Sequence, residues 1–286
     1  MWADICAQLA AATGQPLQFH RADVVAGGDI NEAWRVRTSA GDWFVKLNDA
    51  ARRDMFEAER AGLIALARGI HVPSPVLCGV SGDRAFLVLE WLDLRHRGDE
   101  AALGRQLAQL HRLTAPQFGW AHDNTIGATP QPNGWMDNWL DFFRERRLGH
   151  QFALARQNGL SLRDTRLLLD CLPAFLGEHH VVPSLLHGDL WGGNAAWLAD
   201  GSPVLFDPAC YYGDRETDLA LTSLFGGFSS TFYEAYHATW PLPAGFERRR
   251  DLYNLYHMAN HANMFGGGYI QRTQAMIDAL IVNIQA

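Results

Sequence analysis

The chain has 286 residues, of which 48% are hydrophobic and 19% are charged, and its formal net charge is −7. The apolar content suffices for a sizeable core and excludes a disordered chain, while the length favours two lobes over one compact unit. The net negative charge argues against a nucleic-acid partner, and no Lys/Arg run favours a membrane surface.

The first residues, MWADICAQLAAATG, are typical of an amphipathic helix and not of a signal peptide, because they carry Asp4 and no basic segment. No apolar run approaches ~20 residues, so no membrane span is expected. The four cysteines have no CxxC spacing, which argues against a zinc knuckle or a disulfide framework. Free thiols fit a reducing compartment, and we expect a cytoplasmic location.

Residues 17–48 predict a small antiparallel sheet, in which the strand-like AWRVRT and DWFVKL flank the turn SAGD. A helix is predicted over 52–68, and two further strands between 71 and 92. Beyond Trp91 the periodicity becomes helical, in the segments 98–113, 134–149, 161–176, 215–225 and 247–262. The sequence therefore predicts an α+β fold with a strand-rich lobe over 1–92 and a helix-rich lobe over 93–286.

The segment LLHGDLWGGNAAW, residues 185–197, leaves an apolar strand and places Asp189 five residues before Asn194. The apolar runs AAWL and VLF then flank Asp200-Gly201, a signal for a two-residue type I′ hairpin. A turn centred there puts Asn194 directly opposite Asp207. A neighbouring amide oxygen and carboxylate suit Mg²⁺, which completes its shell with phosphates and water.

The spacing H-x-D-x-x-x-x-N, followed by a strand-terminal Asp, is typical of phosphoryl transfer of the protein-kinase type. In this interpretation Asp189 accepts the proton of a substrate hydroxyl, Asn194 and Asp207 hold Mg²⁺, and His187 supports the loop by a hydrogen bond. The alternative is a loop whose Asp and Asn bond local backbone. That alternative explains each residue alone better than it explains the combined pattern.

The strand-rich lobe supplies candidates for binding ATP. In AGGDINEAW, Gly27 and Gly28 allow close approach of the backbone to phosphates, with Asn31 beside them, although a plain glycine turn is the alternative interpretation. Lys46, in DWFVKL, is placed like the lysine of V-A-I-K.

Glu59 is the expected partner of Lys46. It lies on an apolar face of the 52–68 helix with no local cation, and a buried carboxylate is costly unless it is paired. Glu57 has Arg53 and Arg60 at helical spacing instead. The strand AFLVLEWL would lead to the connection between the lobes, where adenine would bond main-chain groups of residues 90–92, namely Glu90, Trp91 and Leu92.

Several residues near Asp189 have two open interpretations. The indole of Trp191 packs on a sugar ring or attracts a substrate amine, or it fills the core. Asp214 and Glu216 bind a cationic substrate amine, or lie on a solvated face. Asp218 begins a helix, or accepts backbone N–H bonds from the loop that carries Asp189.

His257 and His261 have the i, i+4 spacing of metal ligands, but neither an HExxH motif nor a third ligand accompanies them, so zinc is not expected. The tryptophans at 120, 135 and 139 are expected to fill the core of the helical lobe, with a place beside the substrate as the alternative.

Together these residues carry a family resemblance. The segments LLHGDLWGGNAAW, LFDPACYYGDRETDLAL, FGGF and LYHMANHANMFGGGY resemble the fructosamine kinase (ketosamine-3-kinase) family, as do GGDINEAWRV, FVKLN, MFEAERAGLIAL and FGWAHDNTIGATPQPNGWMDNWLDFFRERRL. The Trp of HGDLWGGN and the FDPA…YYG segment are its most specific marks. The resemblance covers nearly the whole chain.

The resemblance implies a protein-kinase-like bilobal fold and ATP-dependent phosphorylation of the 3-hydroxyl of a ketosamine, a fructosamine or ribulosamine that is free or on protein. The product decomposes and frees the amine, so the family is regarded as a deglycation system. Asp189 would be the base, Asn194 and Asp207 the metal ligands, and Trp191 a sugar contact. Lys46 with Glu59 would position the phosphates of ATP.

The chain departs from the family pattern at two positions. Asp214 stands where the family often has His, which changes the charge near the expected substrate site. Asp29 stands where some members carry a Cys, so a redox switch through that loop is not expected. Two other functions stay open from the sequence: a kinase of another small hydroxyl compound, such as an aminoglycoside, a choline-like compound or a sugar, and a non-catalytic nucleotide-binding protein.

Overall fold

The computed structural model describes residues 1–26 and 30–285 and divides into two units. The first unit comprises residues 1–99 together with 196–208, and the second comprises 100–195 together with 209–286. A single division after residue 92 was expected, with 196–208 in the helical lobe. No helix in the described residues is long and apolar enough to cross a membrane.

The first unit is built on a five-stranded antiparallel sheet of order β1-β2-β3-β5-β4. Hairpin connections join β2 to β3 and β4 to β5, and β3 pairs with β5 so that Lys46 lies opposite Leu87. The strands are β1 (Phe19–Val24), β2 (Glu32–Thr38), β3 (Gly41–Asp49), β4 (Pro75–Ser81) and β5 (Arg84–Glu90).

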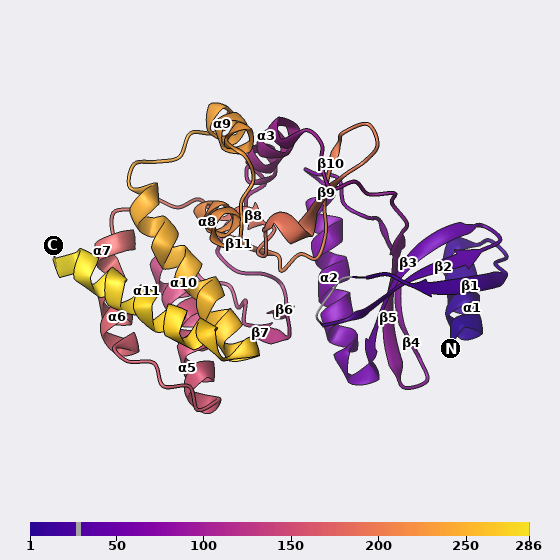
Figure 1. Cartoon of the computed structure of the whole chain (residues 1–286), viewed down its shortest axis with the longest axis horizontal. Helices are drawn as coiled ribbons and strands as arrows, with labels where there is room; N and C mark the ends of the chain where they lie inside the picture. The colour runs from indigo at the N-terminus through magenta and orange to yellow at the C-terminus, as the bar shows by residue number, and fades with distance from the viewer. Residues whose placement is uncertain (27–29, 286) are drawn as a thin grey trace. The chain divides into compact units, whose positions relative to one another are not determined.

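One helix covers each face of this sheet (Figure 1). Alternation along β3 sends Val45 and Leu47 to the face of α1 (Trp2–Thr13), where they pack with Ile5 and Leu9. Lys46 points to the other face, toward α2 (Arg53–Leu66), which follows the short 3₁₀ helix η1 (Ala50–Arg52). Alternate residues of β3 therefore contribute to the apolar core on one face of the sheet and place the Lys46 ammonium group on the other.

The hairpin of β9 (Ala195–Trp197) and β10 (Pro203–Leu205) has a different turn from the one predicted. Gly201 N–H donates to Leu198 O at 3.0 Å and Leu198 N–H donates to Ser202 O at 2.9 Å. Of the two predicted turn residues only Gly201 has a positive φ, 85°, whereas a type I′ turn requires two. The loop is thus one residue longer, because the Asp200 carboxylate accepts Ser202 N–H and keeps Asp200 out of the left-handed region.

The predicted pairing of Asn194 with Asp207 is therefore wrong in register. Asn194 also lies outside the ladder, at the end of the 3₁₀ turn η3 (Gly192–Asn194). Hydrogen bonds explain why this hairpin belongs to the first unit: Trp197 exchanges backbone bonds with Arg95, and Leu205 N–H donates to His71 O.

The second unit is mainly helical. In Figure 1, α10 and α11 run alongside each other within it. Its helices are α3 (Glu100–Leu110), α4 (Trp139–Phe142), the π-helix η2 (Phe143–Gly149), α5 (His150–Gln157), α6 (Thr165–Cys171), α7 (Pro173–Leu176), α8 (Glu216–Leu224), α9 (Ser230–Thr239), α10 (Phe246–Phe265) and α11 (Gly268–Gln285). Two small antiparallel ladders join β6 (Asn124–Ile126) to β7 (Thr129–Gln131) and β8 (Ser184–Leu186) to β11 (Tyr211–Gly213).

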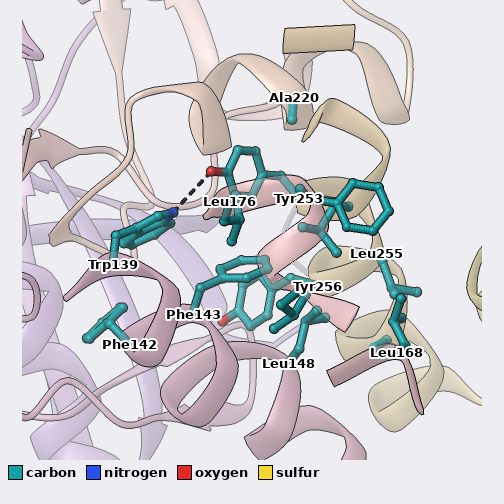
Figure 2. Close-up of a cluster of buried hydrophobic side chains, with 14 of the residues drawn as sticks. Trp139, Phe142, Phe143, Leu148, Leu168, Leu176, Ala220, Tyr253, Leu255 and Tyr256 are labelled. Atoms are coloured by element: carbon teal, nitrogen blue, oxygen red, sulfur yellow. Dashed lines mark hydrogen bonds between the residues drawn. The ribbon is translucent and has the colours of Figure 1, made fainter. Parts of the chain in front are cut away.

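Aromatic side chains dominate the core of the second unit (Figure 2). Trp139 is 4% exposed, and its indole N–H donates to the hydroxyl of Tyr253 at 3.0 Å, which satisfies both polar groups inside an apolar cluster. Trp139 and the partly buried Trp120 fit the expectation of core tryptophans. Trp135 does not, because it is 43% exposed and its ring lies beside that of Tyr212.

Leu167 and Leu168 of α6 give a matched test of this core. Leu168 is fully buried and Leu167 is 45% exposed. We expect Leu168→Ala to lower the free energy of unfolding by about 2–5 kcal/mol, because it leaves a cavity, and Leu167→Ala to change it by less than ~0.5 kcal/mol. Urea unfolding followed by circular dichroism measures both, and equal effects would contradict the assigned faces of α6.

Candidate active site

A buried lysine with two carboxylates forms the polar centre of the first unit. The Nζ of Lys46 lies 2.6 Å from Oε1 of Glu59 and also contacts Oδ1 of Asp207. The expected pair between Lys46 and Glu59 is therefore present, and Asp207 joins it from the segment after β10. The side chains of Lys46 and Glu59 are 8% and 10% exposed, whereas that of Asp207 is 45% exposed. Asp207 can thus bind a further cation.

Electrostatics keeps this lysine charged. Burial alone lowers the pKa of Lys46, but the charges of Asp207 and Glu59 outweigh burial and raise it. Burial raises the pKa of Glu59, and the charge of Lys46 opposes that effect. Asp207 has a φ of 57°, a left-handed conformation that is costly for most residues and is found at functional sites. The two acids therefore keep the ammonium group of Lys46 protonated although it is buried.

The second unit contains the loop with Asp189. The Asn194 amide Nδ2 donates to the backbone O of Asp189 at 2.8 Å and to its carboxylate Oδ2 at 3.3 Å. Asn194 is 6% exposed, and Asn194 N–H donates to Trp191 O. Since Nδ2 faces Asp189, the Oδ1 atom of the same amide has no donor among the described residues. It is an oxygen acceptor of the kind that Mg²⁺ uses.

The backbone around Asp189 is held by a buried carboxylate. Asp218, 1% exposed at the start of α8, accepts the N–H groups of His187 at 2.8 Å and Gly188 at 2.9 Å. His111 Nε2 lies 3.1 Å from the same carboxylate. Burial would raise the pKa of Asp218, but these hydrogen bonds and the charge of His111 lower it, so the group stays ionised. Both interpretations of Asp218 hold, because it lies in the first turn of α8 and its carboxylate accepts N–H groups of the loop.

His187 supports the same loop. Its Nδ1 accepts Asp189 N–H at 3.3 Å, and its backbone O accepts Ala209 N–H at 2.9 Å. Gly188 has a φ of 82° and lies so close to Ala209 that a Cβ would be 2.0 Å from the Ala209 oxygen. Only glycine therefore permits this approach at position 188.

A set of side chains that the sequence interpretation did not single out supports Ala209 and Cys210. Asn124 Nδ2 donates to Cys210 O at 2.8 Å, and Gln131 Nε2 donates to Ala209 O at 3.1 Å. Arg147, fully buried in the π-helix, donates to Asn133 Oδ1 and stacks over the ring of Tyr211 at 3.8 Å. No periodicity marks these residues; the π-helix, a frequent feature of functional sites, is visible only in the structure.

The expected nucleotide-binding residues of the first unit divide into three groups. Gly27 and Gly28, like Asp29, lie outside the described residues. Asn31 Oδ1 accepts Asn48 Nδ2 at 2.7 Å. At the end of β5, Glu90 Oε2 accepts Ser74 N–H, and the Trp91 ring lies under the Arg35 guanidinium at 4.4 Å.

The structure does not support the expected contact of Asp214 and Glu216 with a substrate amine. Both are buried and already paired: Asp214 accepts from His179 Nε2 at 2.7 Å and Tyr253 OH at 2.5 Å, and Glu216 forms two bonds with Arg249. They line a cavity of about 320 Å³ with His179.

The β8–β11 ladder separates that cavity from His187. Tyr211 pairs with Leu186 at the end next to His187, and Gly213 pairs with Ser184 at the other end, next to the cavity. The donor atoms of His179, Asp214 and Glu216 lie within 4.8 Å of one another, but these hydrogen bonds already use the two carboxylates. We regard the group as a structural network. The sequence interpretation placed these acids near Asp189, because it could not show that β11 pairs with β8 and leads the chain to this cavity.

The comparisons with known proteins agree with this geometry. The architecture of both units is the α+β protein-kinase-like fold: an aminoglycoside phosphotransferase superimposes with a TM-score of 0.63 over 97% of this chain and 98% of its own, at 13% identity. A crystal structure of a candidate fructosamine-3-kinase from Haemophilus somnus superimposes with a TM-score of 0.92 over 98% of both chains, at 32% identity. This structural relative and the family that the sequence matches define an ATP-dependent kinase that acts on a hydroxyl group.

The family follows from sequence. The fructosamine kinase family model matches residues 1–283. A probable ketoamine kinase of Synechocystis is 47% identical over 96% of this chain and 95% of its own. The chloroplastic protein-ribulosamine 3-kinase of Arabidopsis thaliana is 42% identical over 96% and 86%. The chain belongs to the fructosamine kinase family, and the resemblance read from its motifs is confirmed.

Asp218→Asn tests the support of the loop. An amide retains the shape but loses the charge that two backbone N–H groups and His111 share, and hydrogen bonds to charged groups contribute about 1.5–3 kcal/mol each. We expect kcat to fall more than tenfold and the unfolding midpoint in urea to fall. Asp278→Asn, at a half-exposed side chain, is the control, and equal kcat values for both variants would contradict the assigned role.

His257 predicts a pH dependence of stability. Burial lowers its pKa to about 3, so the unfolded chain takes up this proton first as pH falls. The contribution of neutral His257 to the free energy of unfolding is fully present above the pKa of the unfolded chain, about 6.5. Below that pH it is lost by up to ~1.4 kcal/mol per pH unit. We expect the unfolding free energy of His257→Gln to decline less between pH 7 and 5 than that of wild type. The exposed His180→Gln should behave like wild type in the same urea titrations.

Proposed function

We propose that this protein transfers the γ-phosphoryl group of ATP to the 3-hydroxyl of a ketosamine, a fructosamine or ribulosamine that is free or attached to protein. The names of its relatives support this substrate class: a ketoamine kinase and a protein-ribulosamine 3-kinase align over nearly the whole chain. The observation that carries the proposal is the set of hydrogen bonds around Asp189: the Asn194 amide donates to Asp189, and the Asp218 carboxylate accepts a backbone N–H group of the same loop.

In this reaction the substrate hydroxyl gives its proton to the Asp189 carboxylate while its oxygen bonds to the γ-phosphorus. The bond between the γ-phosphorus and the bridging oxygen breaks, and ADP leaves. Asn194 restricts the Asp189 carboxylate to one orientation, so that little rotational freedom is lost on substrate binding. His187 and Asp218 hold the backbone that carries it.

The first unit would bind the nucleotide. Lys46, kept charged by Glu59 and Asp207, would bind ATP phosphates and offset the charge that develops on them. Main-chain groups of Glu90, Trp91 and Leu92, at and just after the end of β5, would bond adenine. Asn31 ties the segment after Gly27 and Gly28 to β3 through Asn48, and these glycines would approach the phosphates.

Asn194 and Asp207 are the residues that would hold Mg²⁺. The Oδ1 atom of Asn194 and the half-exposed carboxylate of Asp207 are hard oxygen donors, which fits this ion. When bound, Mg²⁺ would neutralise phosphate charge. The four cysteines, all free, are consistent with the cytoplasmic location that we propose.

The test of this proposal is a phosphorus NMR assay with ATP, Mg²⁺ and a synthetic fructosamine. We expect a new sugar-phosphate resonance with wild type and a loss of at least about 100-fold in rate for Asp189→Asn, with ATP binding retained, because general-base catalysis contributes on that order. Asp93→Asn, at a highly exposed side chain, is the matched control.

Two outcomes would contradict the proposal. Faster transfer to an aminoglycoside, choline or a free sugar than to any fructosamine would assign another substrate. No transfer to any hydroxyl compound in the presence of Mg²⁺ would leave a nucleotide-binding protein without catalysis.

A further inference from the structure

The loop that carries Asp189 contains two successive glycines in one 3₁₀ turn, η3, and they differ in their surroundings. A Cβ on Gly193 would lie 2.3, 2.4 and 2.8 Å from Cη2, Cζ2 and Cε2 of Trp191. A Cβ on Gly192 would meet only the Gly226 oxygen, at 3.5 Å, which is ordinary contact. Neither glycine has a positive φ, so backbone conformation requires glycine at neither position.

The contact at Gly193 therefore concerns the indole ring of Trp191 alone. Carbon atoms in contact are normally about 3.5–4.0 Å apart, so the ring would have to move by about 1 Å or more to accept a methyl group. The six-membered part of the indole lies over Gly193 in the space that a Cβ would fill. Trp191 is nevertheless 40% exposed, so the ring also presents surface to solvent.

The backbone of Trp191 is connected to Asp189 through hydrogen bonds of Asn194. The backbone O of Trp191 accepts Asn194 N–H at 3.0 Å, and the Asn194 side chain donates to Asp189. A partly exposed aromatic surface thus lies in the same turn that orients the carboxylate. Such a surface suits a sugar ring, whose C–H groups pack on it, or a cationic amine, which its π face attracts.

We propose that Gly193 is a positioning residue of this kinase: its missing side chain lets the Trp191 indole pack against the turn and contact the sugar of the ketosamine beside Asp189. This inference rests on the proposed function for the identity of the substrate. It assigns to Gly193 a role in positioning the indole that Gly192, its neighbour in the same turn, does not have.

The matched variants are Gly193→Ala and Gly192→Ala, which make the same chemical change one residue apart. We expect Gly193→Ala to raise KM for a synthetic fructosamine more than tenfold with the KM for ATP within twofold of wild type. Gly192→Ala should stay within twofold for both substrates. Introduced into Trp191→Ala, the Gly193→Ala change should have no further effect, because the clashing ring is gone. Equal effects of Gly193→Ala with and without Trp191 would overturn the proposal.

A second measurement is independent of activity. In protein labelled with ¹⁵N at tryptophan, the indole N–H resonance of Trp191 is the one that disappears in Trp191→Phe. We expect it to shift in Gly193→Ala and to stay in place in Gly192→Ala. A shift without any fructosamine phosphorylation by wild type would refute the substrate and retain the positioning of Trp191. An unshifted resonance in Gly193→Ala would refute the positioning itself.

Discussion

The first unit depends on one buried cation. Lys46 lies on the face of β3 opposite the apolar core, and removing its charge from water is tolerable only because Glu59 and Asp207 lie beside it. The three residues come from a strand, a helix and the segment after a distant hairpin. Because leaving any of the three unpaired would be costly, these contacts tie the strand, the helix and the hairpin segment together, and they keep Lys46 protonated.

In the second unit the corresponding constraint is on the backbone. The role that we propose for Asp189 requires a fixed backbone around it. Buried acceptors of main-chain N–H groups hold that backbone: Asp218 for His187 and Gly188, and His187 for Asp189. Asn194 then orients the side chain itself. Burying the polar groups that hold this loop costs solvation free energy, and their hydrogen bonds to ionised groups offset that cost.

Much of this could be predicted from sequence. Local rules sufficed for the sheet, for α2 and for the pairing of Lys46 with Glu59, since Glu59 has no cation at helical spacing. Local rules failed where a side-chain hydrogen bond or a contact distant in sequence decides the local structure or the environment of a residue. The Asp200 carboxylate lengthened the predicted turn, and Asp214 and Glu216 are buried by partners on α7–β8 and α10 that no local pattern reveals. The 134–149 helix begins five residues later, at Trp139, and passes into a π-helix that periodicity cannot indicate.

The assignment of residues 196–208 to the first unit has a consequence for the evolution and engineering of this chain. Because that hairpin is bonded to His71 and Arg95, and Asp207 to Lys46, neither unit is a continuous stretch of the gene. A fragment ending at residue 99 would lack a carboxylate that its own lysine needs. Recombination between relatives can exchange a lobe intact only by carrying two separate coding segments together, so a single crossover between them would take Lys46 and Asp207 from different parents.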